Sequence, residues 1–435
     1  MSPERQRPTV RLITFGCRVN QYETQMMYDR LAPSFDVAED KADLVVVNGC
    51  TVTSLAERKA RQAIRRVRRA NPQAKVVVVG CLGDAAINGL TRIEDADVLA
   101  GNYWKERIAD VAERTMGGHQ GILAPSKQGT LQEEKITRWR GHVRAFVKVQ
   151  DGCDLSCTFC RTTQVRGKAR SKPVARAVTE CVRLVEGGCP EIVLVGINLA
   201  QYNPPDGDLA ELVERLLDSS KLRRLRLGSI NPTGITKQLV ATLASDERIC
   251  PYFHIPLQSG DDSVLASMHR GYDSGYYLSR IALVRTTIPE ATFGADVMVG
   301  FPGEGEAAFA RTRELIRKVG FANLHIFRYS PRPGTHAANL PHSLPERTKR
   351  DRSRQVEELA REILERIHSD YMGSKRKLLI ENRRNGQWRG YTRTYIDTYV
   401  RSGNGLCPGA EVDVRIDETS GSSLGGVIEN REYKG

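Results

Sequence analysis

Short runs of β-branched residues alternate with amphipathic stretches between residues 11 and 101. The runs read RLITFG, DLVVVN, KVVVVG and DVLAG, and a candidate helix separates each run from the next. Apolar runs of this length, bounded by glycine and polar residues, are typical of buried strands. Strands that alternate with helices indicate a parallel sheet covered by helices. The pattern therefore predicts an α/β domain over residues 9–115 with a parallel sheet.

The same alternation resumes in the middle of the chain, over residues 139–370. Its candidate strands are AFVKVQ, EIVLVG, RLRLGSI, YFHIPLQ, FGADVMVG and NLHIFRYS. Six parallel strands of this kind curve into an incomplete (β/α)6 barrel. A charged segment from Pro345 to Ser369 places Val356, Leu359 and Ile363 at helical spacing, so we expect a helix that closes this domain.

The two ends of the central region have a different composition. Residues 102–140 contain the stretch KQGTLQEEK, which is typical of a connection between domains, and we place a boundary near residue 138. From Lys375 onward, short β-like runs such as KLLIEN and AEVDVRI are broken by Gly and Asn. This pattern predicts a small all-β module over residues 371–435.

Composition limits the class of protein without fixing its activity. The chain has 65 Lys and Arg against 52 Asp and Glu, a net charge of +13, which favours a polyanionic partner but is weak evidence alone. No apolar run of about 20 residues occurs, and no apolar stretch follows the charges of the first seven residues, so we expect a cytoplasmic protein without a membrane segment. Ten cysteines in such a chain are interpreted as ligands or core thiols rather than disulfides.

Three of these cysteines lie in one short loop. Cys153, Cys157 and Cys160 follow the first strand of the central region in DGCDLSCTFC, with the spacing C-x-x-x-C-x-x-C. A structural zinc site normally has four ligands, and no fourth Cys or His lies nearby in the sequence. Three thiolates suit a 4Fe-4S cluster, which keeps one iron open to a cofactor and supports one-electron chemistry. The alternative is three reduced thiols in a loop.

Three other cysteines each follow a strand of the first domain. Cys17 comes after RLITFG, Cys50 after DLVVVN and Cys81 after KVVVVG. The carboxyl ends of parallel strands share one edge of the sheet, where ligand sites form, so we expect these thiols to converge on a second cluster. Each of them alone is more often a small buried residue.

The central region resembles the radical S-adenosylmethionine (SAM) superfamily in its cysteine spacing and its strand-helix units. The resemblance implies SAM bound at the open iron and cleaved reductively to a 5'-deoxyadenosyl radical. The strand end EIVLVGINL stands where that superfamily holds the methionyl amine, so Gly196 and Asn198 are candidate cofactor contacts. A plain turn after a strand is the alternative for these two residues.

Nearly the whole chain is similar to the methylthiotransferase family. The matching motifs are GCRVNQYET, NGCTVT, PLQSGDDSVLASMHRGY, ADVMVGFPGE and FRYSPRPGT, and the C-terminal module resembles a TRAM RNA-binding domain. The motifs VNQYET and CTVT are most similar to the subgroup that acts on N6-threonylcarbamoyladenosine (t6A). The sequence departs from the family pattern at Gly49 and at Arg161-Thr162-Thr163-Gln164.

The resemblance implies a transfer RNA (tRNA) methylthiotransferase with two 4Fe-4S clusters. One equivalent of SAM would methylate sulfur at the second cluster, and another would supply the radical that removes hydrogen from carbon 2 of the adenine. An unactivated carbon-hydrogen bond has no acidic proton for a general base, so radical chemistry is reasonable. The implied partners are the tRNA anticodon loop and an electron donor such as a flavodoxin or ferredoxin.

Three alternatives remain open at this point. The substrate could be isopentenyladenosine in tRNA or a ribosomal protein, and the chain could be an RNA-binding protein whose clusters are structural.

Basic residues dominate the segment ERKARQAIRRVRRANP from Glu57, which predicts either a phosphate-binding helix or a solvated helix face. The tyrosines at 391, 395 and 399 interleave with arginines and are interpreted as base-stacking groups or as core aromatics.

Overall fold

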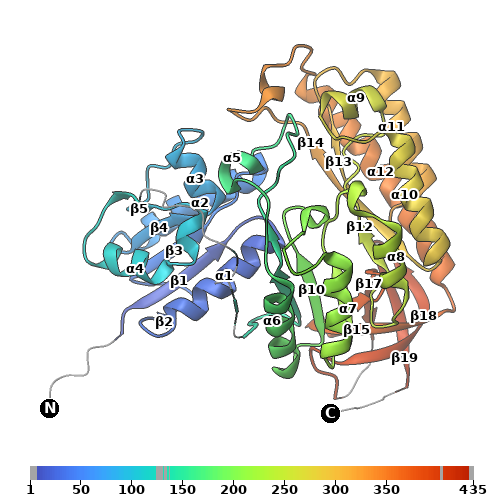
Figure 1. Ribbon diagram of the computed structural model, residues 1–435, viewed down its shortest axis with the longest axis horizontal. Helices are drawn as coiled ribbons and strands as arrows, with labels where there is room; N and C mark the ends of the chain where they lie inside the picture. The colour runs from blue at the N-terminus through green and yellow to red at the C-terminus, as the bar shows by residue number, and fades with distance from the viewer. Residues whose placement is uncertain (1–6, 124–130, 132–134, 137, 402–404, 431–435) are drawn as a thin grey trace.

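A computed structural model of the 435-residue chain describes residues 7–123, 131, 135–136, 138–401 and 405–430. Figure 1 shows a lobe of N-terminal elements beside a larger lobe, with the loop that carries α5 (Thr162–Arg166) between them. The predicted connection KQGTLQEEK lies mostly outside the described residues. The predicted α/β class, with parallel sheets and a C-terminal β-barrel, is confirmed.

The N-terminal lobe is a six-stranded parallel sheet with the strand order β2-β1-β3-β4-β5-β6. Buried residues form separate hydrophobic clusters on its two faces, so the all-apolar runs of the central strands are buried on both sides. The strands are β1 (Thr9–Thr14), β2 (Asp36–Val37), β3 (Leu44–Asn48), β4 (Lys75–Val79), β5 (Val98–Leu99) and β6 (Gly121–Ile122). Its helices are α1 (Arg18–Leu31), α2 (Ser54–Ala70), α3 (Cys81–Ile87), the 3-10 turn η1 (Asn102–Lys105) and α4 (Ile108–Met116).

The larger lobe contains the six predicted parallel strands, arranged as two three-stranded sheets with the orders β11-β10-β7 and β12-β13-β14. Isolated parallel bridges, such as that between Ser229 and His254, join the two sheets into one curved wall. The strands are β7 (Arg144–Lys148), β10 (Glu191–Val195), β11 (Arg224–Leu227), β12 (Tyr252–His254), β13 (Thr292–Val299) and β14 (Asn323–Arg328), and β8 (Gln150–Asp151) pairs with β9 (Arg170–Ser171) at the start of the cysteine loop.

Helices cover the outer face of this wall (Figure 1). They are α6 (Val174–Glu186), α7 (Leu209–Ser219), α8 (Lys237–Ala244), α9 (Asp262–Ser267), α10 (Ser274–Thr287), α11 (Glu306–Val319) and α12 (Glu346–Tyr371), with the 3-10 turns η2 (Leu199–Gln201), η3 (Pro232–Gly234) and η4 (His336–Asn339). The helix expected after Pro345 is α12, and Val356, Leu359 and Ile363 are buried along it.

Alternate residues of the barrel strands point inward, and many of them are charged or aromatic. Arg144 of β7 lies in register with Glu191 of β10, which lies in register with Arg224 of β11. The next residue along each strand, such as Ala145 after Arg144 and Ile192 after Glu191, packs outward into the main hydrophobic cluster under the helices. The outer face of the wall is therefore apolar, whereas its inner face mixes charged residues such as Arg144 with apolar ones such as Phe146 and Val193.

The C-terminal module is a closed barrel with the strand order β15-β16-β17-β19-β18. The strands are β15 (Lys375–Arg384), β16 (Gln387–Thr392), β17 (Asp397–Val400), β18 (Glu411–Ser420) and β19 (Ser423–Asn430). It packs on the amino-terminal ends of the large barrel's strands, where Arg226 donates a hydrogen bond to the carbonyl of Arg393 (3.0 Å). Tyr391 and Tyr395 stack at this junction with ring centroids 4.7 Å apart, so the structure favours packing over free base-stacking for these two rings.

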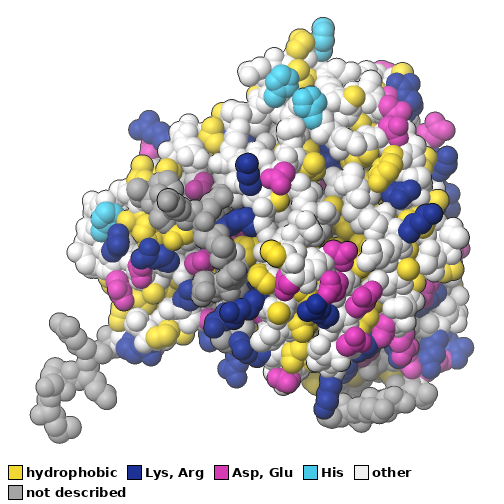
Figure 2. Space-filling model, in the orientation of Figure 1, with side chains coloured by type: hydrophobic (Ala, Val, Ile, Leu, Met, Phe, Trp, Pro, Cys, Tyr) yellow, Lys and Arg dark blue, Asp and Glu magenta, His cyan; other side chains and the backbone are white. Residues whose placement is uncertain are grey.

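In the described part of the chain, no helix combines the length and the apolar character needed to cross a membrane. Figure 2 shows Lys and Arg interspersed with Asp and Glu on one face of the molecule. On this face the net positive charge is therefore not gathered into one basic surface.

Candidate metal centres between two domains

The structure brings Cys17, Cys50 and Cys81 together at one edge of the N-terminal sheet. Strands β1, β3 and β4 are neighbours, and each of these cysteines lies just beyond the carboxyl end of one of them. Cys17 is the N-cap of α1, and Cys81 is the first residue of α3. Burial raises the pKa of the Cys17 thiol, although Arg166 and the backbone amide of Asn20 oppose the rise.

A glycine allows the first two of these thiols to approach each other. Gly16 has φ +101°, and a Cβ at this position would lie 2.8 Å from the Sγ of Cys50. Gly49 is similarly confined, because its Cβ would lie 2.5 Å from that of Leu82. Any larger residue at position 49 would have to displace Leu82. The departure at Gly49 therefore follows from local packing.

The second set, Cys153, Cys157 and Cys160, lies in the loop that leaves the barrel after β8. Gly152 begins the loop with φ +69°, and its Cβ would lie 1.9 Å from the carbonyl oxygen of Lys168, so the turn requires glycine. The amides of Leu155 and Thr162 each donate to a thiol, to Cys153 and Cys160 respectively, at 3.4 Å. Arg270 donates to Cys157 Sγ at 3.2 Å. Hydrogen bonds of this kind tune the potential of an iron-sulfur cluster.

The chemistry of both donor sets fits a metal centre. Burial raises the pKa of the Cys50 thiol to about 12, and the neighbouring Cys81 and Cys17 add to the rise. Burial also raises the pKa of the Cys153 thiol, although the Leu155 amide and the Asn198 side chain oppose the rise. Thiols in such positions ionise when a bound metal supplies positive charge, because a coordinating thiol loses its proton.

The thiols of each set are spaced more widely than a single ion requires. All six cysteines lie in the described part of the chain, and in neither set do all three Sγ atoms lie within 4.8 Å of one another. Tetrahedral zinc, with Zn–S bonds of about 2.3 Å, needs sulfurs about 3.8 Å apart. The wider spacing fits a centre made of several metal atoms.

Gly196 and Asn198 lie at the carboxyl end of β10, beside the cysteine loop. The Asn198 amide donates to Gln150 Oε1 at 2.8 Å, and its side chain accepts from the amide of Ala200 and contacts Cys153. A Cβ at Gly196 would lie 2.9 Å from the side chain of Gln150. Both residues therefore line the end of the barrel where the three thiols gather.

The two thiol sets are joined by a buried arginine that sequence reasoning missed. Arg166, the last residue of α5, donates to Cys81 Sγ at 3.1 Å and to carboxylates of Glu23 and Asp151 at 2.8 Å. It also donates to the side-chain oxygen of Asn20 at 2.6 Å. A guanidinium with five fixed donors suits this junction because it can serve several acceptors at once. No spacing rule predicts a contact between residues 81 and 166.

A second bridge uses the segment that departs from the family pattern. Arg161, only 2% exposed, donates to the hydroxyl of Thr51 at 3.1 Å and to the carbonyl of Leu90 at 3.2 Å. Arg332 donates to the carbonyl of Thr51 at 2.7 Å and forms an ion pair with Glu57. Each thiol set is thus adjacent in sequence to a bridging residue, since Arg161 follows Cys160 and Thr51 follows Cys50.

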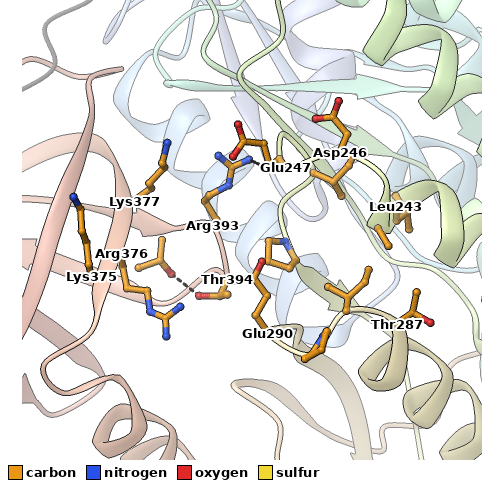
Figure 3. Close-up of a pocket in the computed structure, with 16 residues that line it drawn as sticks. Leu243, Asp246, Glu247, Thr287, Glu290, Lys375, Arg376, Lys377, Arg393 and Thr394 are labelled. Atoms are coloured by element: carbon orange, nitrogen blue, oxygen red, sulfur yellow. Dashed lines mark hydrogen bonds between the residues drawn. The ribbon is translucent and has the colours of Figure 1, made fainter.

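A cavity lies at the opposite end of the barrel. It has a volume of about 490 Å³ and lies between the segments that precede β12 and β13 and the C-terminal barrel. In Figure 3 the basic residues Lys375, Lys377 and Arg393 come from the C-terminal barrel. The acidic residues Asp246 and Glu247 come from the larger, central barrel (Figure 3). The lining of this cavity does not include any of the six cysteines named above.

Comparison with known proteins identifies the family. A family model described as the radical SAM superfamily matches residues 147–316, and one described as uncharacterized protein family UPF0004 matches residues 9–101. The threonylcarbamoyladenosine tRNA methylthiotransferase MtaB of Thermotoga maritima is 35% identical over 401 residues, which cover 90% of both chains. The chain belongs to the radical SAM methylthiotransferase family. It is therefore an enzyme that uses SAM and a 4Fe-4S cluster.

Other relatives of this methylthiotransferase support the same family assignment. The MtaB protein of Aquifex aeolicus is 34% identical over 395 residues, covering 88% of this chain and 94% of the relative. The tRNA-2-methylthio-N(6)-dimethylallyladenosine synthase of Endomicrobium trichonymphae is 30% identical over 422 residues, covering 95% and 98%. Among solved structures, the radical SAM methyltransferase TsrM of Kitasatospora setae has a TM-score of 0.55 and 14% identity over 77% of each chain, a likeness of fold alone.

Proposed function

We propose that this methylthiotransferase adds a methylthio group to carbon 2 of t6A beside the anticodon of tRNA. One iron-sulfur cluster would be held by each thiol set. The observation that carries the proposal is that two sets of three thiols, each following strand ends of its own domain, lie on either side of the Arg166 junction. An enzyme that forms a carbon-sulfur bond by radical chemistry needs a radical source and a sulfur site near one base.

Cys153, Cys157 and Cys160 hold the cluster that binds SAM in this proposal. When bound, that cluster supplies the electron that cleaves SAM into methionine and a 5'-deoxyadenosyl radical. Gly196 and Asn198 line the cofactor side, because both lie at the end of β10 and Asn198 contacts Cys153. Gly196 allows the side chain of Gln150 to pack closely against the strand end, and Asn198 holds the turn in place through its backbone and side chain.

Cys17, Cys50 and Cys81 hold the second cluster, at which sulfur is handled. Arg166 stabilises negative charge on Cys81 and holds this set close to the radical-generating loop. The nearby arginine favours the ionised state of these thiols, whereas burial opposes it until a bound metal supplies positive charge. An electron donor such as a flavodoxin or ferredoxin reduces the clusters.

The tRNA substrate follows from the relatives and from the chemistry of the fold. Relatives 33–35% identical over most of the chain are named as threonylcarbamoyladenosine tRNA methylthiotransferases. A base beside the anticodon is already in a loop, so moving it out of its stack costs little free energy. The C-terminal barrel, which resembles a TRAM domain, and the exposed basic residues of α2 such as Arg58 and Lys59 bind the phosphate backbone.

Nucleoside analysis tests the proposal. In cells that lack this protein, digested tRNA should contain t6A without its 2-methylthio derivative, and the wild-type gene should restore the derivative. Loss of 2-methylthio-isopentenyladenosine instead would assign the enzyme to the other tRNA subgroup. Unchanged nucleosides together with a missing methylthio group on a ribosomal peptide would refute a tRNA substrate.

A further inference from the structure

The interior of the large barrel receives one side chain from the N-terminal lobe. Arg18 directly follows Cys17, and its guanidinium donates to the hydroxyl of Tyr395 at 3.0 Å. The same guanidinium lies 5.7 Å from the ring centroid of Phe146, which shares the inward side of β7 with Arg144. Arg18 therefore extends from the neighbourhood of one thiol set into the interior of the barrel.

Arg18 differs from the other interior arginines in its partners. Arg144 is paired with Glu381, and Arg226 is paired with Glu191 at 2.9 Å. Among the described residues, the partners of Arg18 are a phenol hydroxyl and two aromatic rings, and no carboxylate lies within 4.0 Å of it. Aromatic faces and a phenol hold a guanidinium in position without neutralising it. A half-buried cation of this kind attracts an anion.

A histidine cluster lies on the same interior surface. His254 Nε2 and His325 Nδ1 lie 3.3 and 3.1 Å from Asp296 Oδ1, and the hydroxyl of Tyr252 lies 3.2 Å from His254 Nδ1. Tyr252 also packs against Tyr395 in a tilted arrangement, with ring centroids 4.7 Å apart, so the cluster is continuous with the surroundings of Arg18. Asp296 Oδ1 faces both imidazole rings, and the side chain of His325 is 53% exposed.

An exposed aromatic ring completes this surface. Phe327 lies two residues beyond His325 on β14, on the same side of the strand, and is 37% exposed. Its register partner Met298 packs in the same cluster as Phe159, which lies between Cys157 and Cys160. An open ring near the thiol loop, with polar groups deeper in the barrel, suits a flat base that carries a polar substituent.

We propose that Arg18 and His325 form a subsite for the N6 substituent of the target adenosine, with Arg18 binding its carboxylate. The inference rests on the proposed function and deepens it. A threonylcarbamoyl group ends in a carboxylate and a hydroxyl, so it needs a cation and a hydrogen-bond acceptor. Arg18 supplies the first. His325 supplies the second through Nε2, because its Nδ1–H is donated to Asp296. An isopentenyl group would leave both polar residues without a partner.

The test compares two RNA stem-loops that carry either t6A or its threoninamide analogue, which lacks the negative charge. Binding is measured anaerobically for wild type, Arg18→Gln and His325→Phe, and methylthiolation is measured on the same samples. Arg317→Gln, on the exposed face of α11, is the control for loss of one positive charge. Iron content and the thermal unfolding midpoint show whether each variant is folded.

Wild type and Arg317→Gln should bind the t6A stem-loop about 10- to 100-fold more tightly than the amide, as expected for a hydrogen-bonded charge pair. In Arg18→Gln this ratio should fall towards one, and His325→Phe should weaken binding of both stem-loops, since both carry the hydroxyl. A wild-type ratio near one would overturn the proposal, as would an unchanged ratio in a folded Arg18→Gln.

A metal ion at the histidine cluster is the competing interpretation, because His254, Asp296 and His325 have ligand atoms within 4.8 Å of one another. Metal analysis of the holoenzyme distinguishes these two interpretations of the histidine cluster. A stoichiometric ion beyond the iron of the clusters, lost in His325→Phe, would overturn the role of His325. If wild type binds the carboxylate but methylthiolates neither stem-loop, the subsite stands and the proposed activity fails. If wild type methylthiolates both stem-loops without discriminating between them, the proposed activity stands and the subsite fails.

Discussion

Arg166 Nε lies 3.1 Å from the Sγ of Cys81, although the two residues belong to different domains and are 85 positions apart in sequence. Arg166 closes the helix α5 that follows the radical SAM loop, and Cys81 begins a helix of the N-terminal sheet. This guanidinium is therefore one of the groups that set where the two thiol sets lie relative to each other. Its burial and its pairing with Asp151 hold it in that position.

Replacing Arg166 should affect the second cluster more than the first. Arg166→Lys keeps the positive charge but loses the planar donor set, so the hydrogen bond to Cys81 should be lost. We expect a lower reduction potential for the cluster at Cys17, Cys50 and Cys81, since hydrogen bonds to sulfur raise it. Potentiometric titration followed by electron paramagnetic resonance measures both clusters in one sample. Equal shifts in both, or none, would contradict this role.

The bridge at Glu57 should give a distinct acid dependence of stability. Burial raises its pKa, but hydrogen bonds from Thr91, Thr51 and Arg332 outweigh it and lower the pKa from 4.5 to about 2. The ionised form is therefore favoured in the folded state, and its contribution is present above pH 4.5 and lost as the pH falls to about 2. Wild type should be more stable than Glu57→Gln at pH 6, with the difference in unfolding midpoint shrinking over that range. A difference that is constant with pH would refute this account.

The radical SAM loop should not tolerate loss of any of its thiols. Cys157→Ala removes one of the three proposed ligands and leaves Arg270 without the sulfur to which it donates. We expect reductive cleavage of SAM to fall to background, measured as 5'-deoxyadenosine under reducing conditions without RNA. Cys407→Ala, at an exposed position of the C-terminal part, is the matched control and should retain cleavage. Normal 5'-deoxyadenosine formation by Cys157→Ala would refute the ligand assignment.

The basic helix α2 should contribute to RNA binding through charge alone. Arg58 and Lys59 are exposed, whereas Arg61 and Arg68 of the same helix are ion-paired with Glu57 and Asp97. If both exposed cations contact phosphates, Arg58→Ala/Lys59→Ala should weaken tRNA binding and reduce the salt dependence of log Kd by a slope of about 1.5 to 2. Arg317→Ala/Lys318→Ala on α11 is the matched control. Identical slopes in the two double variants would exclude α2 from the interface.

Part of this architecture could be predicted because it depends on the order of strands. Cys17, Cys50 and Cys81 converge because β1, β3 and β4 are neighbours in a parallel sheet, and the spacing of strand and helix indicates that arrangement. The loop of Cys153, Cys157 and Cys160 is local in sequence. Its compactness is therefore visible in the spacing itself.

The contacts between domains could not be predicted in the same way. Arg161 and Arg332 contact Thr51 across the domain boundary. Hydrophobic periodicity predicts the elements within a domain but not how two folded domains pack against each other. The tyrosines of the C-terminal module illustrate the same limit. Tyr395 packs against Tyr252 of the large barrel, a contact that depends on how the C-terminal barrel docks.

The central claim is that two separate clusters do different work, and Cys50→Ala tests it most directly. The variant, purified and reconstituted anaerobically, should hold about half the iron of wild type, because two similar clusters become one. It should still form 5'-deoxyadenosine, since the loop of Cys153 is intact, and it should form no methylthio product. Cys181→Ala, which changes a thiol buried in the core, should keep full iron and full product. Full iron content together with full methylthiolation in Cys50→Ala would contradict the two-cluster account.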